Sequence, residues 1–139
     1  MELSPTKTHV TNLAHERIRF LGYEISKLTS EAGRRRTGCT SFSVPADVIR
    51  KRISDCTKSK KPCARDDLVN RSVEEIIREY ASEINGLYNY YSLASNVSTR
   101  LHRLAWFHEG SMLMTIAKKE RSSVRKVLRK YGRVVPRPD

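Results

Sequence analysis

The chain has 139 residues, 38% of them apolar and 30% charged, and its 27 Lys and Arg against 15 Asp and Glu give a net charge of +12. This length suits about one domain with its own core, and the apolar fraction excludes a disordered chain. No apolar run approaches the roughly 20 residues of a transmembrane helix, and the first 20 residues lack the apolar stretch of a secretion signal. We therefore expect a basic globular protein that does not span a membrane.

The first third of the chain is predicted to be β-structure. Polar and apolar side chains alternate in KTHVTNL (7–13) and again in RIRFLGYEI (17–25), as is typical of strands. The connecting NLAHER then predicts a hairpin formed by these two segments. SEAGRRRTGCTS (30–41) is rich in Gly, Ser, Thr and Arg, and this composition predicts a loop.

Helical spacing begins at Pro45, a residue suited to a first helical turn. The apolar residues recur at intervals of one, three and four as Val44, Val48, Ile49, Ile53 and Cys56. TKSKKPCARDD (57–67) breaks this pattern and is expected to form an exposed basic loop. Ser72, with Glu75 three residues later, is the signature of a capping box and predicts the start of a second helix.

Glycines divide the predicted second half of the chain. Gly86 is expected to interrupt or kink the second helix, and Gly110 to end a third one. The stripe of that third helix is Tyr90, Leu93, Val97, Leu101, Leu104 and His108. Two shorter helices are expected at 112–118 and 123–131, the latter closed by Gly132. The expected fold is α+β and mainly α: a short N-terminal β-hairpin followed by a thumb-like bundle of four to five helices.

Nothing in the sequence indicates catalysis, a metal site or a cofactor. The three cysteines are odd in number and lack C-x-x-C spacing, so we expect reduced, mostly buried thiols rather than disulfides or a zinc site. Asp66 and Asp67 are adjacent, but a two-metal site needs a tight turn between apolar strands, and a Lys-rich loop precedes them here. We find no nucleophile motif and no glycine-rich phosphate loop.

The positive charge is concentrated in two blocks. Residues 1–33 have no net charge, 34–65 carry +8, 66–99 carry −4 and 100–139 carry +8. Two basic surfaces that flank a phosphate backbone would produce this segregation, so nucleic-acid binding is favoured over a merely solvated surface. Tyr90 is expected in the core, while Tyr88 or Tyr91 could contact RNA; the helical period alone does not choose between them.

Five segments in order resemble one family. LSPTKTHVTNL, RIRFLGYEI, SVPADVI, GLYNYYSLASN and TIAKKERSS resemble the end of the palm and the maturase (thumb, or X) domain of group II intron-encoded reverse transcriptases. The resemblance covers Leu3 to Gly132. The family often has a basic residue where this chain has Asn85. The motif positions are occupied by Lys7, Thr8, Phe20, Leu21, Gly22, Tyr23, Gly86, Leu87, Asn89, Tyr90, Tyr91, Ala94, Asn96, Thr115, Ala117, Lys119 and Arg121.

The resemblance implies that residues 1–33 correspond to the end of the palm and 34–139 to the helical maturase domain. It also implies that Asn89 and Tyr90 order the central helices. The implied function is to bind structured group II intron RNA and to assist its splicing. The candidate RNA-binding residues are Arg34, Arg35, Arg36, Arg50, Lys51, Lys58, Lys60, Lys61, Tyr88, Tyr91, Asn96, Arg100, Arg103, Lys118, Lys119, Arg121, Arg125 and Lys126.

Two alternatives remain open. The chain could be a non-catalytic fragment of an RNA-directed DNA polymerase that clamps the primer-template duplex, since the catalytic palm with its paired aspartates is absent. It could instead be an architectural protein of an organellar ribosome or another ribonucleoprotein. The expected partners are accordingly intron or ribosomal RNA and the remainder of a reverse transcriptase or other ribonucleoprotein proteins. The expected compartment is a bacterial cytoplasm or an organelle.

Overall fold

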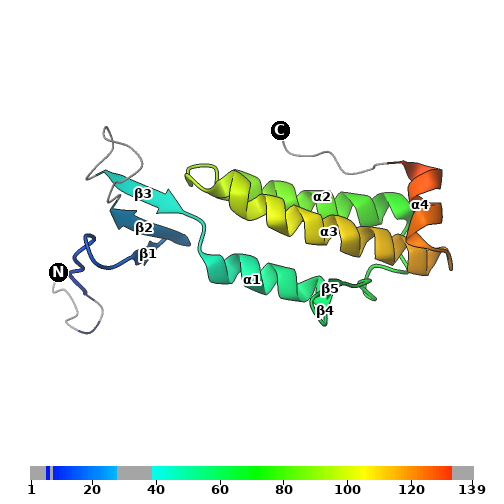
Figure 1. Cartoon of the computed structure of the whole chain (residues 1–139), viewed down its shortest axis with the longest axis horizontal. Helices are drawn as coiled ribbons and strands as arrows, with labels where there is room; N and C mark the ends of the chain where they lie inside the picture. The colour runs from blue at the N-terminus through cyan, green and yellow to red at the C-terminus, as the bar shows by residue number, and fades with distance from the viewer. Residues whose placement is uncertain (1–5, 7, 28–38, 133–139) are drawn as a thin grey trace.

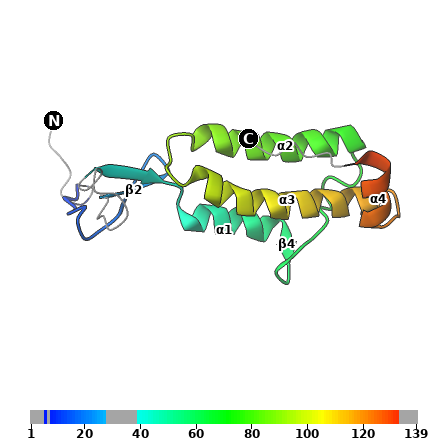
Figure 2. The same cartoon turned by 45° about the horizontal axis from the view of Figure 1, so that its top comes forward.

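The computed structural model describes residues 6, 8–27 and 39–132. Within these residues a small antiparallel sheet lies at one end of an elongated molecule, and four helices make up the rest (Figure 1). This arrangement confirms the α+β, mainly α fold. Helices α2 and α3 lie side by side along the long axis, α1 lies alongside α3, and α4 covers the far end (Figures 1 and 2).

The sheet contains β1 (Ile18–Phe20), β2 (Tyr23–Lys27) and β3 (Thr40–Ser43) in that order. Leu21 and Gly22 form the β1–β2 turn with φ of 49° and 77°, the left-handed pair that a tight two-residue hairpin uses. The hairpin therefore lies inside RIRFLGYEI. The predicted pairing of 7–13 with 17–25 is wrong, because residues 8–13 form no strand and the chain reverses at this turn instead.

The third strand lies partly in the segment that was expected to be a loop. β3 pairs with β2 in antiparallel register, which places Phe42 opposite Ile25. The sheet thus draws on both sides of the boundary predicted between residues 33 and 34, and that division stays a prediction. Arg34, Arg35 and Arg36 lie outside the described residues.

Helix α1 (Ala46–Asp55) follows Pro45 and is confirmed. The basic segment behind it is exposed, as expected, but it contains a short hairpin of β4 (Thr57–Lys58) and β5 (Lys61–Pro62). Ser59 and Lys60 form its turn with φ of 52° and 64°. The hairpin projects from the end of α1, away from α2 (Figure 2).

Helix α2 (Val73–Tyr90) opens with the predicted capping box. The Glu75 backbone N–H donates to Ser72 Oγ at 3.2 Å, and the Ser72 N–H donates to Glu75 Oε2 at 2.9 Å. The interruption predicted at Gly86 is wrong, since α2 continues through it. Glycine costs an α-helix about 1 kcal/mol, and burial of Ile84 against the neighbouring helix opposes that cost.

Helix α3 (Val97–Lys119) runs through Gly110, so the predicted end there and the separate helix at 112–118 are wrong. A Cβ atom at Gly110 would lie 2.7 Å from Pro62 Cγ, which shows that this glycine admits the β4–β5 hairpin. Helix α4 (Val124–Tyr131) is confirmed, with Ser123 as its N-cap and Gly132 at φ 70° beyond its end.

Two buried clusters hold the helices together. The first joins α2, α3 and α4 and is formed by Leu68, Ile76, Tyr80, Met112, Leu113, Ile116, Ala117 and Val127. The second joins α1, the end of α2 and the start of α3 and is formed by Val44, Ile49, Ile84, Tyr91, Ala94, Leu101 and Leu104. Helices α2 and α3 contribute to both clusters. They are therefore the common support on which the remaining elements are placed.

Candidate nucleic-acid interface

The segment GLYNYYSLASN is the end of α2 and the turn to α3, not part of one helix with the residues that follow. Tyr91 is 4% exposed, whereas Tyr90 is 55% exposed. The prediction of Tyr90 as a core residue is therefore wrong. The predicted stripe from Tyr90 to His108 assumed one helix, whereas α2 ends at Tyr90 and α3 begins only at Val97. Tyr91 is the buried tyrosine, and we remove it from the candidate RNA contacts.

The tyrosines connect this helix end to the sheet. Tyr90 Oη donates a hydrogen bond to the Leu21 carbonyl at 2.6 Å, and Tyr91 Oη donates to the Gly22 carbonyl at 3.2 Å. Tyr23 Oη donates in turn to the Tyr90 carbonyl, and the rings of Tyr23 and Tyr90 stack with centroids 6.0 Å apart. Because a Cβ at Gly22 would lie 2.9 Å from Tyr90 Oη, the turn needs a glycine here.

The turn between α2 and α3 also holds β3 and α1. The Ser95 N–H donates to the Phe42 carbonyl at 2.9 Å, and Asn96 Oδ1 accepts from the Val44 N–H at 2.8 Å. Asn96, a candidate RNA contact, therefore has a structural role: it fixes the chain entering α1 beside the start of α3. Tyr88 is half-buried, and its hydroxyl lies 3.3 Å from Ser98 Oγ.

A groove with a volume of about 710 Å³ lies between α1 and the start of α3. It brings together four candidates from distant parts of the sequence, namely Arg50, Asn96, Arg100 and Arg103. No carboxylate lines it, and none of its three arginines has an ion pair with another described residue. Sequence reasoning missed the other lining residues, which are Ala46, Ile49, Ile53 and Thr99, because their apolar or neutral character carries no signal of binding.

The remaining candidate cations among the described residues fall in two further places. Lys58, Lys60 and Lys61 are exposed on the β4–β5 hairpin, and Lys51 is exposed on α1. The second group, at the end of α3 and on α4, comprises Lys118, Lys119, Arg121, Arg125 and Lys126. All of its members are exposed except Lys119, which is half-buried.

Lys118 differs from the others because it has an acidic partner. Its ammonium group bonds the Asp66 carboxylate, and this contact lowers the pKa of Asp66. Asp66 and Asp67 are thus engaged separately, the latter 3.3 Å from Arg65. The described residues contain no group of His, Cys, Asp and Glu side chains suited to a metal ion.

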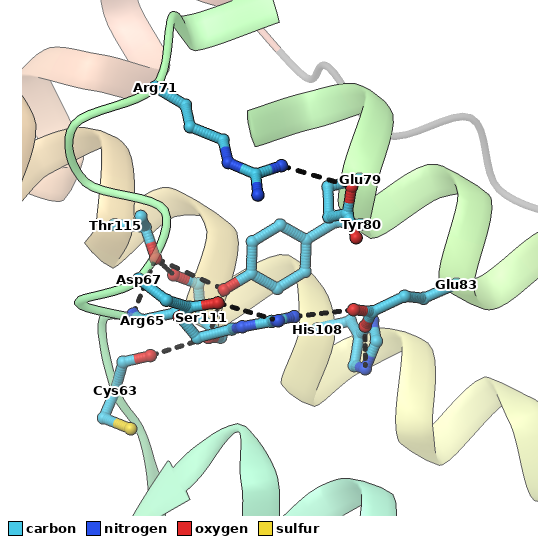
Figure 3. A network of polar contacts seen from close by, with 10 residues as sticks. All are labelled: Cys63, Arg65, Asp67, Arg71, Glu79, Tyr80, Glu83, His108, Ser111 and Thr115. Atoms are coloured by element: carbon cyan, nitrogen blue, oxygen red, sulfur yellow. Dashed lines mark hydrogen bonds and ion pairs between the residues drawn. The ribbon is translucent and has the colours of Figure 1, made fainter. Parts of the chain in front are cut away.

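A buried polar network supports the middle of α2 and α3 (Figure 3). Arg65 donates to Glu83 at 2.8 Å, and its guanidinium lies over the Tyr80 ring. Tyr80 Oη lies 2.8 Å from Ser111 Oγ, which in turn donates to the Cys63 carbonyl at 2.6 Å. These bonds attach the segment between β5 and α2 to both long helices, so the basic hairpin has a fixed base.

The cysteines are more varied than expected. Cys56 is buried, and burial raises the pKa of its thiol to about 11. Cys63 is half-buried and Cys39 is exposed, so the prediction of mostly buried thiols is wrong for Cys39, which lies at the edge of the sheet just before β3. All three are free thiols.

Comparison with known sequences identifies the family of this chain. The sequence pattern of the family described as type II intron maturase matches residues 38–139, which is most of the chain. The chain belongs to the type II intron maturase family. The match covers the helices, the β4–β5 hairpin and the groove together.

Several curated relatives of this maturase chain extend the match into the N-terminal sheet. The group II intron-encoded protein LtrA of Lactococcus lactis subsp. cremoris is 37% identical over 144 residues, covering 92% of this chain and 24% of LtrA. Maturase K of Iris orientalis is 26% identical over 142 residues, covering 91% of this chain and 27% of that protein. The chain thus spans about a quarter of the length of these relatives.

None of the helices in the described ranges combines the length and the apolarity that crossing a bilayer requires.

Proposed function

We propose that this maturase chain binds structured RNA of a group II intron and assists its splicing. The support is the groove between α1 and α3, where arginines from two separate segments share one surface that no carboxylate of the described residues lines. Uncompensated cations on a rigid support gain most from a polyphosphate, because each contact releases condensed counterions. Membership of the type II intron maturase family favours an intron as the source of that RNA.

The mechanism is electrostatic and depends on shape. The described cations occupy α1, the β4–β5 hairpin, the start of α3 and the α3–α4 junction, so no single recognition helix carries them. Such a distribution suits a folded RNA, whose phosphates approach from several directions, better than reading of bases in a DNA major groove. We expect no catalysis by the chain itself.

The salt dependence of RNA binding tests this function. We expect the logarithm of the affinity for a folded intron RNA to fall linearly with the logarithm of salt concentration, with a slope of roughly 0.7–0.9 per phosphate contact. The triple variant Lys58→Ala, Lys60→Ala, Lys61→Ala should lose about one to three contacts from that slope. Lys118→Ala, Lys119→Ala, Arg121→Ala should lose fewer, since Asp66 competes for Lys118.

A matched control separates contact from net charge. Arg71 and Arg78 line a hollow together with Glu75 and Glu79, so the double variant Arg71→Ala, Arg78→Ala removes two positive charges from an acidic face. Its slope should equal that of the native chain. The control removes two charges and the β4–β5 triple variant removes three. The same loss of slope per charge removed in both would contradict the proposal, because only the total charge would then matter.

A second candidate is that the chain is part of an RNA-directed DNA polymerase and clamps its primer-template duplex. It is favoured by a group of exposed apolar side chains around the sheet and the α2–α3 turn, which a further protein segment could cover: Phe20, Leu21, Phe42, Tyr90 and Leu93. The mass and the polymerase activity of the natural gene product distinguish the two. Crosslinking followed by sequencing of the bound RNA distinguishes intron from ribosomal RNA, and with it a role in splicing from one in an organellar ribosome. Cell fractionation tests the proposed compartment, a bacterial cytoplasm or an organelle.

A further inference from the structure

The groove between α1 and α3 has two unlike walls. The α3 side presents Asn96, Thr99, Arg100 and Arg103, spaced as one stripe of a helix. The α1 side presents the half-buried Ala46 and Ile53 together with Arg50, and Ile49, which is only 4% exposed, lies between them as the floor. One wall is thus polar and cationic, and the other is mostly apolar.

Double-stranded RNA offers no apolar face that could pack against the apolar wall. It presents phosphates and riboses to a protein, while its bases remain stacked on one another inside the helix. Burial of Ala46 and Ile53 against such a surface would bring apolar carbons against charged oxygens, which is unfavourable. The cationic wall alone would serve a duplex, so the apolar wall indicates an occupant with an apolar face of its own.

An unpaired nucleotide has both faces. Its base is flat and apolar above and below, and enzymes and RNA-binding modules hold extruded bases between apolar or aromatic side chains. Its phosphate suits paired arginines, which bond phosphate oxygens through two N–H groups at once. The volume of about 710 Å³ falls within the range of pockets that enclose ligands of this size.

We propose that this groove holds an unpaired nucleotide of the RNA, with its base against Ala46 and Ile53 and its phosphate at Arg100 and Arg103. The inference rests on the proposed RNA binding and adds a preference to it. The chain should favour RNA that exposes a bulged or looped-out base over RNA of equal length that is fully paired. The preference depends only on the side chains that line the groove, whereas the overall affinity depends on all the basic surfaces.

Two RNA hairpins of equal nucleotide number test the preference, one fully paired and one with a single bulged adenosine in the stem. The native chain should bind the bulged hairpin about five- to tenfold more tightly. The double variant Arg100→Ala, Arg103→Ala should bind both hairpins equally and more weakly. Ala46→Gln, which narrows the groove at the first turn of α1, should weaken binding of the bulged hairpin by a larger factor than binding of the paired hairpin.

The protein variant Lys58→Ala, Lys60→Ala, Lys61→Ala on the β4–β5 hairpin serves as the control, since it should weaken binding of both RNAs by the same factor. Equal affinity of the native chain for the two RNAs would overturn the inference and leave the proposed function standing. Retention of the preference in Arg100→Ala, Arg103→Ala would also overturn it. Failure of the native chain to bind either RNA would instead overturn the proposed function. Thermal melting of each variant confirms that it remains folded.

Discussion

Arg121 occupies a backbone conformation that glycine usually takes. It follows the last turn of α3 with φ of 48°, and the Ser122 N–H reaches back to the Ala117 carbonyl at 2.8 Å, as in a Schellman motif. An L-residue in this conformation costs roughly 1–2 kcal/mol. An arginine at a position where glycine would be more stable suggests that its charge is needed for binding.

Replacing Arg121 by two different residues separates these effects. Arg121→Gly should raise the free energy of unfolding by about 0.5–1 kcal/mol, since it removes the strain, while it lowers RNA affinity and the salt slope by about one contact. Arg121→Ala should lower RNA affinity equally but bring no gain in stability. Urea denaturation and RNA titration measure the two quantities. Unchanged RNA binding in both variants would mean that Arg121 does not contact RNA.

His108 is a buried titratable side chain that lacks a hydrogen bond to any described residue. Neither ring nitrogen has a hydrogen-bond partner among the described residues, although Nε2 lies 3.7 Å from Glu83 Oε2 and the ring meets Tyr80 edge to face. Burial lowers the pKa of His108; Glu83 opposes this shift, while Arg65 and Arg52 reinforce it. The native chain therefore holds this imidazole neutral.

The lowered pKa of His108 predicts a loss of stability in mild acid. Below the ordinary histidine pKa of about 6.5 the unfolded chain binds a proton that the folded chain resists, so the free energy of unfolding should fall as pH falls through that range. His108→Phe keeps the ring contact with Tyr80 and should flatten the profile between pH 7.5 and about 5.5. Urea denaturation across this range measures it. His102→Gln, at an exposed position, should retain the native slope.

Single residues also show what the sequence could and could not predict. The family pattern contains Tyr90 and Tyr91 side by side, but it does not say which of them is buried, because their burial depends on where α2 ends. A helical stripe read through Tyr90 assumes one continuous helix. Only the three-dimensional contact of the turn with the helix end shows that Tyr91 faces inward.

At the scale of elements, two glycines inside helices differ in the space around them. A Cβ at Gly86 would meet nothing within 4 Å, whereas one at Gly110 would lie 2.7 Å from Pro62 Cγ. Gly86→Ala should therefore stabilise α2 by about 0.5–1 kcal/mol. Gly110→Ala should destabilise the protein by about 1–3 kcal/mol, because the β4–β5 hairpin must move. Urea denaturation compares the pair, and destabilisation by both substitutions would contradict the described environment of Gly86.

Element ends with local signals were predictable and those without were not. Pro45 before α1, the Ser72 and Glu75 capping box and Gly132 after α4 all act through neighbouring backbone groups, so the sequence contains the whole cause. Gly110 lies inside α3 rather than at its end, and the residue that packs against it, Pro62, is 48 positions away in the sequence. The groove likewise needed the placement of α1 on α3, which no local pattern specifies.

At the scale of the whole molecule, the two buried clusters share α2 and α3 and should unfold together. Leu104 belongs to one cluster and Ile116 to the other, and both side chains are fully buried. Leu104→Ala and Ile116→Ala should each lower the free energy of unfolding by about 2–5 kcal/mol. Each should leave a single transition, because neither cluster can open without disrupting the helices that both require.

Trp106 allows this to be checked, since it is the single tryptophan and lies on α3 between Leu104 and Ile116. Its fluorescence and the far-ultraviolet circular dichroism should change at the same urea concentration in the native chain and in both variants. Separate midpoints for the two signals in either variant would show that the clusters unfold independently.

The bond from Val44 to Asn96 has a mechanical consequence. It joins the strand side of the molecule to the first residue before α3, at the rim of the arginine groove, while Ser95 holds Phe42 immediately beside it. We therefore expect a displacement of the sheet to move Asn96, which lines the groove. The width of the groove should accordingly change when another molecule or polypeptide segment binds the sheet.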